Sequence, residues 1–129
     1  MYKTIQVGVK VIIKNSEDLY LLIQRSGPKT MWDIPGGRIN PEEDLQTALA
    51  REVKEEINAT LTGTPKLLAA QDIFVPAKNF HVVRLTYRLS MDVHDVALSD
   101  EHDAHCWVSR EDALKLDLDP YLQEVLAKL

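Results

Sequence analysis

Cysteine is almost absent from this 129-residue sequence, in which Cys106 is the only one. A single cysteine excludes an internal disulfide and suits a reducing compartment. Long apolar stretches are missing as well: no run of about 18 apolar residues occurs, so no membrane-spanning helix is expected. The first residues, MYKTIQVGVKVIIK, lack the basic start, apolar centre and small-residue cleavage site of a secretory signal. We therefore expect a cytoplasmic protein.

Basic residues are in the minority, with 15 Lys and Arg against 20 Asp and Glu, a net charge of −5. A protein that binds a nucleic-acid polymer needs a basic surface to neutralise several phosphates, so this class of partner is excluded. Small phosphorylated substrates stay compatible with the charge, because a bound metal ion can supply the positive charge locally. The length and the hydrophobic content of 45% predict one globular domain over residues 1–129.

Apolar and polar residues alternate in several segments, which predicts β-strands. The clearest case is residues 5–13, and a turn at residues 15–18 leads into a second strand, so a hairpin is expected at the start of the fold. In all, strands are expected at residues 5–13, 19–24, 66–75, 80–91 and 105–108.

The first helix is expected to start near Asn40, which would be its N-cap, with Pro41 at the first helical position and Glu43 at the third. Asn40 and Glu43 also have the spacing of a capping box. Helix boundaries vary by about a turn, so the helix could begin as late as Asp44.

Two further helices are expected near the C-terminus. Ser109 would cap a helix that runs to Leu116, and Asp119 followed by Pro120 would cap a last helix with Leu129 on its buried face. Strands and helices interleave without a regular βαβ repeat. The expected architecture is therefore α/β, a mixed sheet between helices.

Residues 37–59, GRINPEEDLQTALAREVKEEINA, contain the strongest functional signal. On a helix, Glu52, Glu55 and Glu56 fall within about a third of a turn of each other, so three carboxylates share one face. Like charges at this spacing destabilise a helix by roughly a few tenths of a kcal/mol unless a cation lies between them. Mg²⁺ or Mn²⁺, which take oxygen ligands, would suit a site between these carboxylates. A glutamate-rich helix can also be ordinary solvated surface, so the carboxylates alone leave both interpretations open.

The whole segment resembles the Nudix box, Gly-x5-Glu-x7-Arg-Glu-U-x-Glu-Glu-x-Gly-U, where U is aliphatic. Asn58 stands where the family has glycine, and Ala59 stands where it has a larger aliphatic residue. We expect Asn58 to end the helix in the left-handed conformation, which Asn adopts more readily than most residues. The residues that match the pattern in register are Gly37, Glu43, Arg51, Glu52, Val53, Glu55 and Glu56.

The resemblance implies a Nudix-type α/β/α sandwich and roles for the residues of the box. Glu55 and Glu56 would be metal ligands, and Glu52 would be a ligand that could also act as the general base. Arg51 would orient the site through salt bridges. The backbone carbonyl of Gly36 would be a further ligand, and Gly37 would let the chain pass close to the metal and the phosphates. Glu43, on the opposite side of a continuous helix from Glu52, would brace the start of the helix.

Residues outside the box complete the predicted site. Family members often add a carboxylate from a later loop as a metal ligand or base. We expect Glu101 in this role, with Asp100 and Asp103 as the other candidates. The alternative is that this acidic loop is ordinary solvated surface. His102, His105 and Cys106 could suggest zinc, but His105 and Cys106 are adjacent and would point to opposite sides of a strand. Expected substrate contacts, with packing or solvated surface as the alternative for each, are Arg25, Lys29, Trp32, Arg38, Phe80 and Arg84.

The resemblance implies hydrolysis of a nucleoside diphosphate linked to another group. The compact size and the WDIPGGRIN segment are similar to MutT-like enzymes, so we favour nucleoside or deoxynucleoside triphosphates cut to a monophosphate and pyrophosphate. The alternatives are ADP-ribose or a nucleotide sugar as substrate, and a nucleotide-sensing module without turnover. Many family members form dimers, so a homodimer is compatible with the resemblance.

Overall fold

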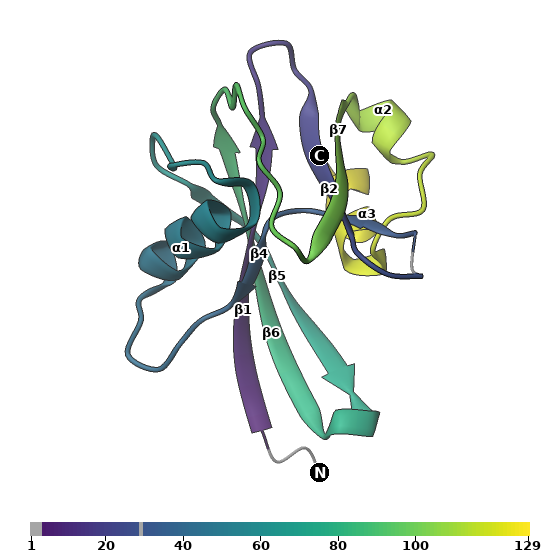
Figure 1. Cartoon of the computed structure of the whole chain (residues 1–129). Coiled ribbons are helices and arrows are strands. Elements are labelled where there is room, and N and C mark those ends of the chain that lie inside the picture. Colours follow the sequence, from purple (N-terminus) through teal and green to yellow (C-terminus); the bar gives the residue numbers. More distant parts are fainter. Residues whose placement is uncertain (1–3, 29) are drawn as a thin grey trace.

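The computed structural model describes residues 4–28 and 30–129, so the substrate contact predicted for Lys29 lies outside the described residues. Its helices are α1 (Leu45–Ile57), α2 (Arg110–Ala113) and α3 (Pro120–Ala127), with a short 3-10 helix at Pro76–Lys78 (Figure 1). The strands form one seven-stranded sheet: β1 (Thr4–Lys14), β2 (Tyr20–Arg25), β3 (Trp32–Asp33), β4 (Gly36–Arg38), β5 (Lys66–Val75), β6 (Phe80–Ser90) and β7 (His102–Val108).

The sheet is mixed. β1 runs parallel to β6 along its whole length, from the pair Thr4 and Phe80 to the pair Lys14 and Ser90, and β5 is antiparallel to β6. β2 pairs with β3 and β7. The predicted hairpin between β1 and β2 is paired only where Lys14 faces Tyr20. The two strands then diverge, and β4 pairs with β1 in the place that β2 would have taken.

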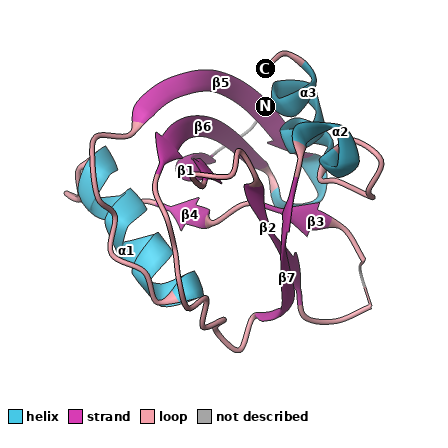
Figure 2. Cartoon of the chain, turned by 90° about the horizontal axis from the view of Figure 1, so that it is seen from above, coloured by secondary structure: helices cyan, strands magenta, loops and turns pink. Residues whose placement is uncertain are grey.

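Each face of the sheet has its own hydrophobic core, as the strand alternation requires. On β1, Val9, Val11 and Ile13 belong to the core that α1 covers, whereas Ile12 belongs to the core beneath α2 and α3. Figure 2 shows α1 on one side of the sheet and the two other helices on the opposite side. The predicted α/β/α sandwich is therefore confirmed.

The start of α1 corrects the prediction of a helix from Asn40. The helix begins at Leu45, and its N-cap is Asp44, whose carboxylate accepts a hydrogen bond from the backbone N–H of Thr47 at 2.7 Å. Residues 40–43 form a separate turn in which the Glu43 carboxylate accepts the N–H of Asn40. Glu42 has a φ of 64°, which interrupts any continuous helix at this point. The later of the two starts that the pattern allowed is the observed one.

The end of α1 agrees with the prediction. Asn58 is left-handed, with φ 54° and ψ 37°, and its N–H donates to the carbonyl of Lys54. Ala59 is buried in the α1 core. Asn58 thus supplies the conformation for which the family pattern uses glycine.

The C-terminal elements differ from the prediction in their bounds. β7 begins at His102 instead of residue 105. α2 ends at Ala113 instead of Leu116, because the next backbone bonds span three residues and tighten into a turn. Leu129 is 39% exposed and lies beyond the buried face of α3. In the part of the chain that the structure describes, no helix is long and apolar enough to cross a membrane.

Candidate active site

The two glycines of β4 bring the backbone of this strand between β1 and α1. Gly36 has a φ of 149°, and a Cβ at this position would collide with the carbonyl of Val9 on β1. A Cβ on Gly37 would lie 2.6 Å from the carboxylate of Glu52 on α1. A side chain at Gly36 would therefore push β4 away from β1, and one at Gly37 would displace the Glu52 carboxylate. Glycine is required here for close approach of three elements.

Glu56 points inward from α1 and is only 6% exposed. Its Oε1 accepts a hydrogen bond from the N–H of Gly36 at 3.1 Å. Burial raises the pKa of Glu56 to about 7, against the opposing effects of Lys10 and of the Gly36 hydrogen bond. His102 lies 3.9 Å away through its Nε2, and burial lowers the pKa of this imidazole. The centre of the site is thus a carboxylate that the protein itself compensates poorly.

Arg51 is the hub of the ion pairs around the box. Its Nε and Nη2 donate to the two carboxylate oxygens of Glu43 at 2.8 and 2.9 Å, and its Nη1 donates to Glu52 at 2.8 Å. Nη2 also donates to the carbonyl of Arg38 at 3.0 Å, and Nη1 reaches Glu55 at 3.4 Å. The hydrogen bonds from Arg51 hold the pKa of Glu43 at about 2. Arg51 therefore joins α1, the turn before it and β4 in one network.

The three clustered glutamates face different partners. Glu52 and Glu55 turn toward the guanidinium of Arg51, whereas Glu56 turns toward β4. Among residues 4–28 and 30–129, no group of three His, Cys, Asp or Glu side chains is arranged to hold a metal ion. In this arrangement Arg51 pairs with both Glu52 and Glu55, and its positive charge offsets the repulsion between these two carboxylates. Ordering all three carboxylates around one ion would require side-chain rotation.

The loop that carries Glu101 is attached to the C-terminal end of α1. The backbone N–H of Ser99 donates to the carbonyl of Glu56 at 3.1 Å, and the N–H of Ala97 donates to that of Ile57. The Glu101 side chain is exposed, and its negative charge acts on the neighbouring His102. The rival Asp103 is engaged by the hydroxyl of Ser26 at 2.7 Å. The fold therefore brings the Glu101 loop to the end of the helix that carries Glu56.

The predicted substrate contacts are divided between the surface and the core. Arg38 is exposed, and its guanidinium lies 5.3 Å from the centre of the Phe80 ring. Arg25 is also exposed, at the end of β2. Trp32 instead packs against the core beneath α2 and α3, as its alternative interpretation allowed. Arg84 is 5% exposed, so the expectation of a solvated or phosphate-binding side chain at this position is wrong.

An ionic network around the buried Arg84 was not predicted. Arg84 donates to Asp33 at 3.0 Å and to Asp119 at 2.9 Å, and Lys10 donates to Asp33 at 3.2 Å. Burial acts to raise the pKa of Asp33, but the charges of Lys10 and Arg84 outweigh it and the pKa is lowered. Lys10 and Arg84 stand at the polar positions of alternating strands, so no local signal distinguished them from solvated charges. These charges meet only in the tertiary structure, because 23 to 51 residues separate the partners.

Comparison with known proteins agrees with this geometry. Residues 4–129 match the model of the NUDIX domain. The sequence is 30% identical to CTP pyrophosphohydrolase of Escherichia coli over 92% of this chain and 85% of that protein. It is 36% identical to the asymmetrical bis(5'-nucleosyl)-tetraphosphatase of Caenorhabditis elegans over 75% of this chain and 72% of that protein. The crystal structure of a MutT protein from Methanosarcina mazei superposes with a TM-score of 0.86 at 30% identity, covering 99% of this chain and 94% of that one. The chain therefore belongs to the Nudix hydrolases, a family of enzymes that act on pyrophosphate bonds of nucleotides.

Proposed function

We propose that this enzyme hydrolyses nucleoside or deoxynucleoside triphosphates to a monophosphate and pyrophosphate, with Mg²⁺ or Mn²⁺ as cofactor. The observation that carries the proposal is the buried carboxylate of Glu56, held against Gly36 and beside the Glu52 carboxylate over Gly37. The similarity to CTP pyrophosphohydrolase, which extends over most of both chains, and to the nucleoside triphosphatase NudI of Klebsiella pneumoniae supports triphosphates as the substrate class.

The residues present fit a hard divalent cation. Glu56 is a nearly buried carboxylate that accepts a hydrogen bond from the backbone N–H of Gly36, and a bound cation would relieve the remaining cost of its ionisation. Glu52, Glu55 and Glu56, with the carbonyl of Gly36, would hold the ion through oxygen atoms, the donors that Mg²⁺ and Mn²⁺ prefer. When bound, such an ion neutralises phosphate charge and acidifies water.

The other residues of the site would position these ligands and the substrate. Arg51, fixed by Glu43, would hold Glu52 beside Gly37 through its charge-assisted hydrogen bond. Glu52 or Glu101 would accept the proton of the attacking water. Arg38 and Arg25, both exposed near the site, would contact the substrate phosphates, and Phe80 beside Arg38 would contact the base.

A second substrate class is favoured by the 36% identity to the asymmetrical bis(5'-nucleosyl)-tetraphosphatase. Both classes carry a chain of phosphates between or beside nucleosides, so the same carboxylates would serve. The products distinguish them. A triphosphate would yield pyrophosphate, whereas asymmetrical cleavage of a dinucleoside tetraphosphate would yield a mononucleotide and a nucleoside triphosphate.

The experiment is product analysis by chromatography after incubation with Mg²⁺. The panel holds the common triphosphates, oxidised triphosphates, a dinucleoside tetraphosphate, ADP-ribose and a nucleotide sugar. Glu56→Gln is expected to lower kcat/KM by at least about 100-fold, because a ligand that compensates phosphate charge is lost. Glu124→Gln, on the exposed side of α3, is the matched control and should keep the wild-type rate. Full activity of Glu56→Gln, or activity only on ADP-ribose or the nucleotide sugar, would overturn the proposal.

A further inference from the structure

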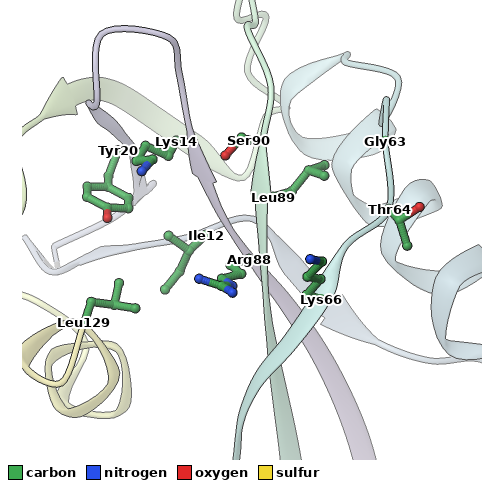
Figure 3. Close-up of a pocket in the computed structure, with 10 residues that line it drawn as sticks. All are labelled: Ile12, Lys14, Tyr20, Gly63, Thr64, Lys66, Arg88, Leu89, Ser90 and Leu129. Carbon is green, nitrogen blue, oxygen red and sulfur yellow. The ribbon is translucent and has the colours of Figure 1, made fainter.

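A cavity of about 420 Å³ opens at the end of the sheet where β1 and β6 finish and β5 begins. Figure 3 shows side chains from these three strands and from β2 around it. None of the lining residues belongs to the segment from Gly36 to Glu56 that forms the proposed catalytic site. The residues that matter for its chemistry are Ile12, Lys14, Tyr20, Lys66, Arg88 and Ser90.

Three cationic side chains, those of Lys14, Lys66 and Arg88, line the cavity. Lys66 on β5 lies directly opposite Arg88 on β6 in the strand register. Like charges in directly opposed positions destabilise a pair of strands. Among the residues that the structure describes, neither side chain has an acidic partner, and Lys14 has only a 3.5 Å pair with the exposed Asp18. This concentration is unexpected in a chain of net charge −5.

The remaining lining adds hydroxyl donors and an apolar surface. Tyr20 and Ser90 contribute hydroxyl groups, and Ile12 and Leu89 are buried side chains at the wall of the cavity. The volume falls within the range of about 300–1,000 Å³ that is typical of small-molecule sites. Cations and hydroxyl donors beside apolar atoms suit a phosphorylated molecule, because ammonium and guanidinium groups form charge-assisted hydrogen bonds to phosphate oxygens.

We propose that this cavity is a second anion site, which binds an oligophosphate group separately from the catalytic carboxylates. Lys66 and Arg88 would contact the phosphates from opposite strands, Lys14 would approach from β1, and Tyr20 and Ser90 would donate hydroxyl hydrogen bonds. The bound anion would relieve the repulsion between Lys66 and Arg88. The oligophosphate could be free or part of a nucleotide, and in a nucleotide the base would lie against Ile12, which is on the same face of the sheet as Lys66 and Arg88.

The test is an NMR titration of the isotope-labelled full chain with tripolyphosphate in EDTA at low salt. The backbone amides of Lys14, Lys66, Arg88 and Ser90 are expected to shift in a saturable manner. The apparent Kd should rise at least about fivefold in the double variant Lys66→Gln/Arg88→Gln, and it should rise with salt because counterions compete. Both residues are exposed, and their replacement removes a repulsive pair, so the double variant should fold.

Lys78→Gln/Lys115→Gln, which removes two exposed lysines elsewhere, is the matched control for net charge and should bind like the wild type. The titration is repeated with ATP and with adenosine. Tighter binding of ATP than of tripolyphosphate would identify a nucleotide site, whereas equal binding of the two would identify a site for the oligophosphate alone. The proposal is overturned if these amides do not shift, or if they shift equally in the double variant. Because metal is absent, the outcome does not depend on whether triphosphates are cleaved.

Discussion

Replacing Glu56 by Gln is expected to stabilise the metal-free enzyme at alkaline pH. The ordinary pKa of 4.5 is raised to about 7 by burial, so ionising Glu56 is more costly in the folded state than in the unfolded state. A difference of about 2.5 pH units corresponds to about 3 kcal/mol. The stability gained by keeping Glu56 protonated in the folded state is fully present below pH 4.5, and it is lost as the pH rises through the folded-state pKa of about 7. Gln is neutral throughout and keeps an oxygen that can accept the Gly36 hydrogen bond.

The measurement is urea unfolding of both proteins in EDTA at pH 5 and pH 8. At pH 5 the free energies of unfolding should differ by no more than about 1 kcal/mol, and at pH 8 the Gln variant should be more stable by about 3 kcal/mol. Because both proteins are measured at each pH, the contributions of other groups that titrate between pH 5 and pH 8 cancel in the difference between wild type and variant. Glu55→Gln is the control, because its side chain is 57% exposed and its replacement should change stability by about 0.5 kcal/mol or less.

Addition of Mg²⁺ at pH 8 supplies the second half of this test. A cation bound at Glu56 should stabilise the wild type in a concentration-dependent manner and leave the Gln variant nearly unchanged. The reasoning is refuted if the stability difference between the two proteins is the same at pH 5 and pH 8. It is refuted equally if the wild type is the more stable protein at pH 8 without metal.

Three further substitutions test other parts of the site. Arg51→Lys keeps the charge but loses the two-pronged contact with Glu43, so kcat/KM should fall at least about tenfold; an unchanged value would remove the positioning role. Gly37→Ala places a Cβ 2.6 Å from the Glu52 carboxylate, which must then move, so most of the activity should be lost while the free energy of unfolding in urea changes by about 1 kcal/mol or less. Wild-type turnover would contradict the close approach. Arg84→Met removes the cation of Asp119 and one of the two cations of Asp33, both partly buried, and should cost about 1–3 kcal/mol at pH 7. Because the pKa of Asp33 is lowered, that cost should shrink as the pH falls below about 4, and a cost independent of pH would refute it.

Features that depend on neighbouring residues were predictable from the sequence. The strand predicted at residues 66–75 is β5 with the same bounds, and Asn58 was expected to end α1 in the left-handed conformation that it adopts. Neighbouring residues did not determine where α1 starts, because both Asn40 and Asp44 are residue types that favour the N-cap position. The turn at residues 40–43 decides between them, and its shape depends on the contact of Glu43 with Arg51 eight positions later.

The spacing of the glutamates, with the glycine and arginine around them, determined the family and the helix on which the chemistry depends, because helical periodicity is a local property of the chain. The tertiary structure alone decided that β4 takes the place of β2 beside β1, that Glu56 is buried against Gly36, and that Arg84 pairs with Asp33 across 51 residues. It also brought Lys66 opposite Arg88. These features follow from strand register and from burial. Both are set by the packing of distant segments against each other, so no local pattern encodes them.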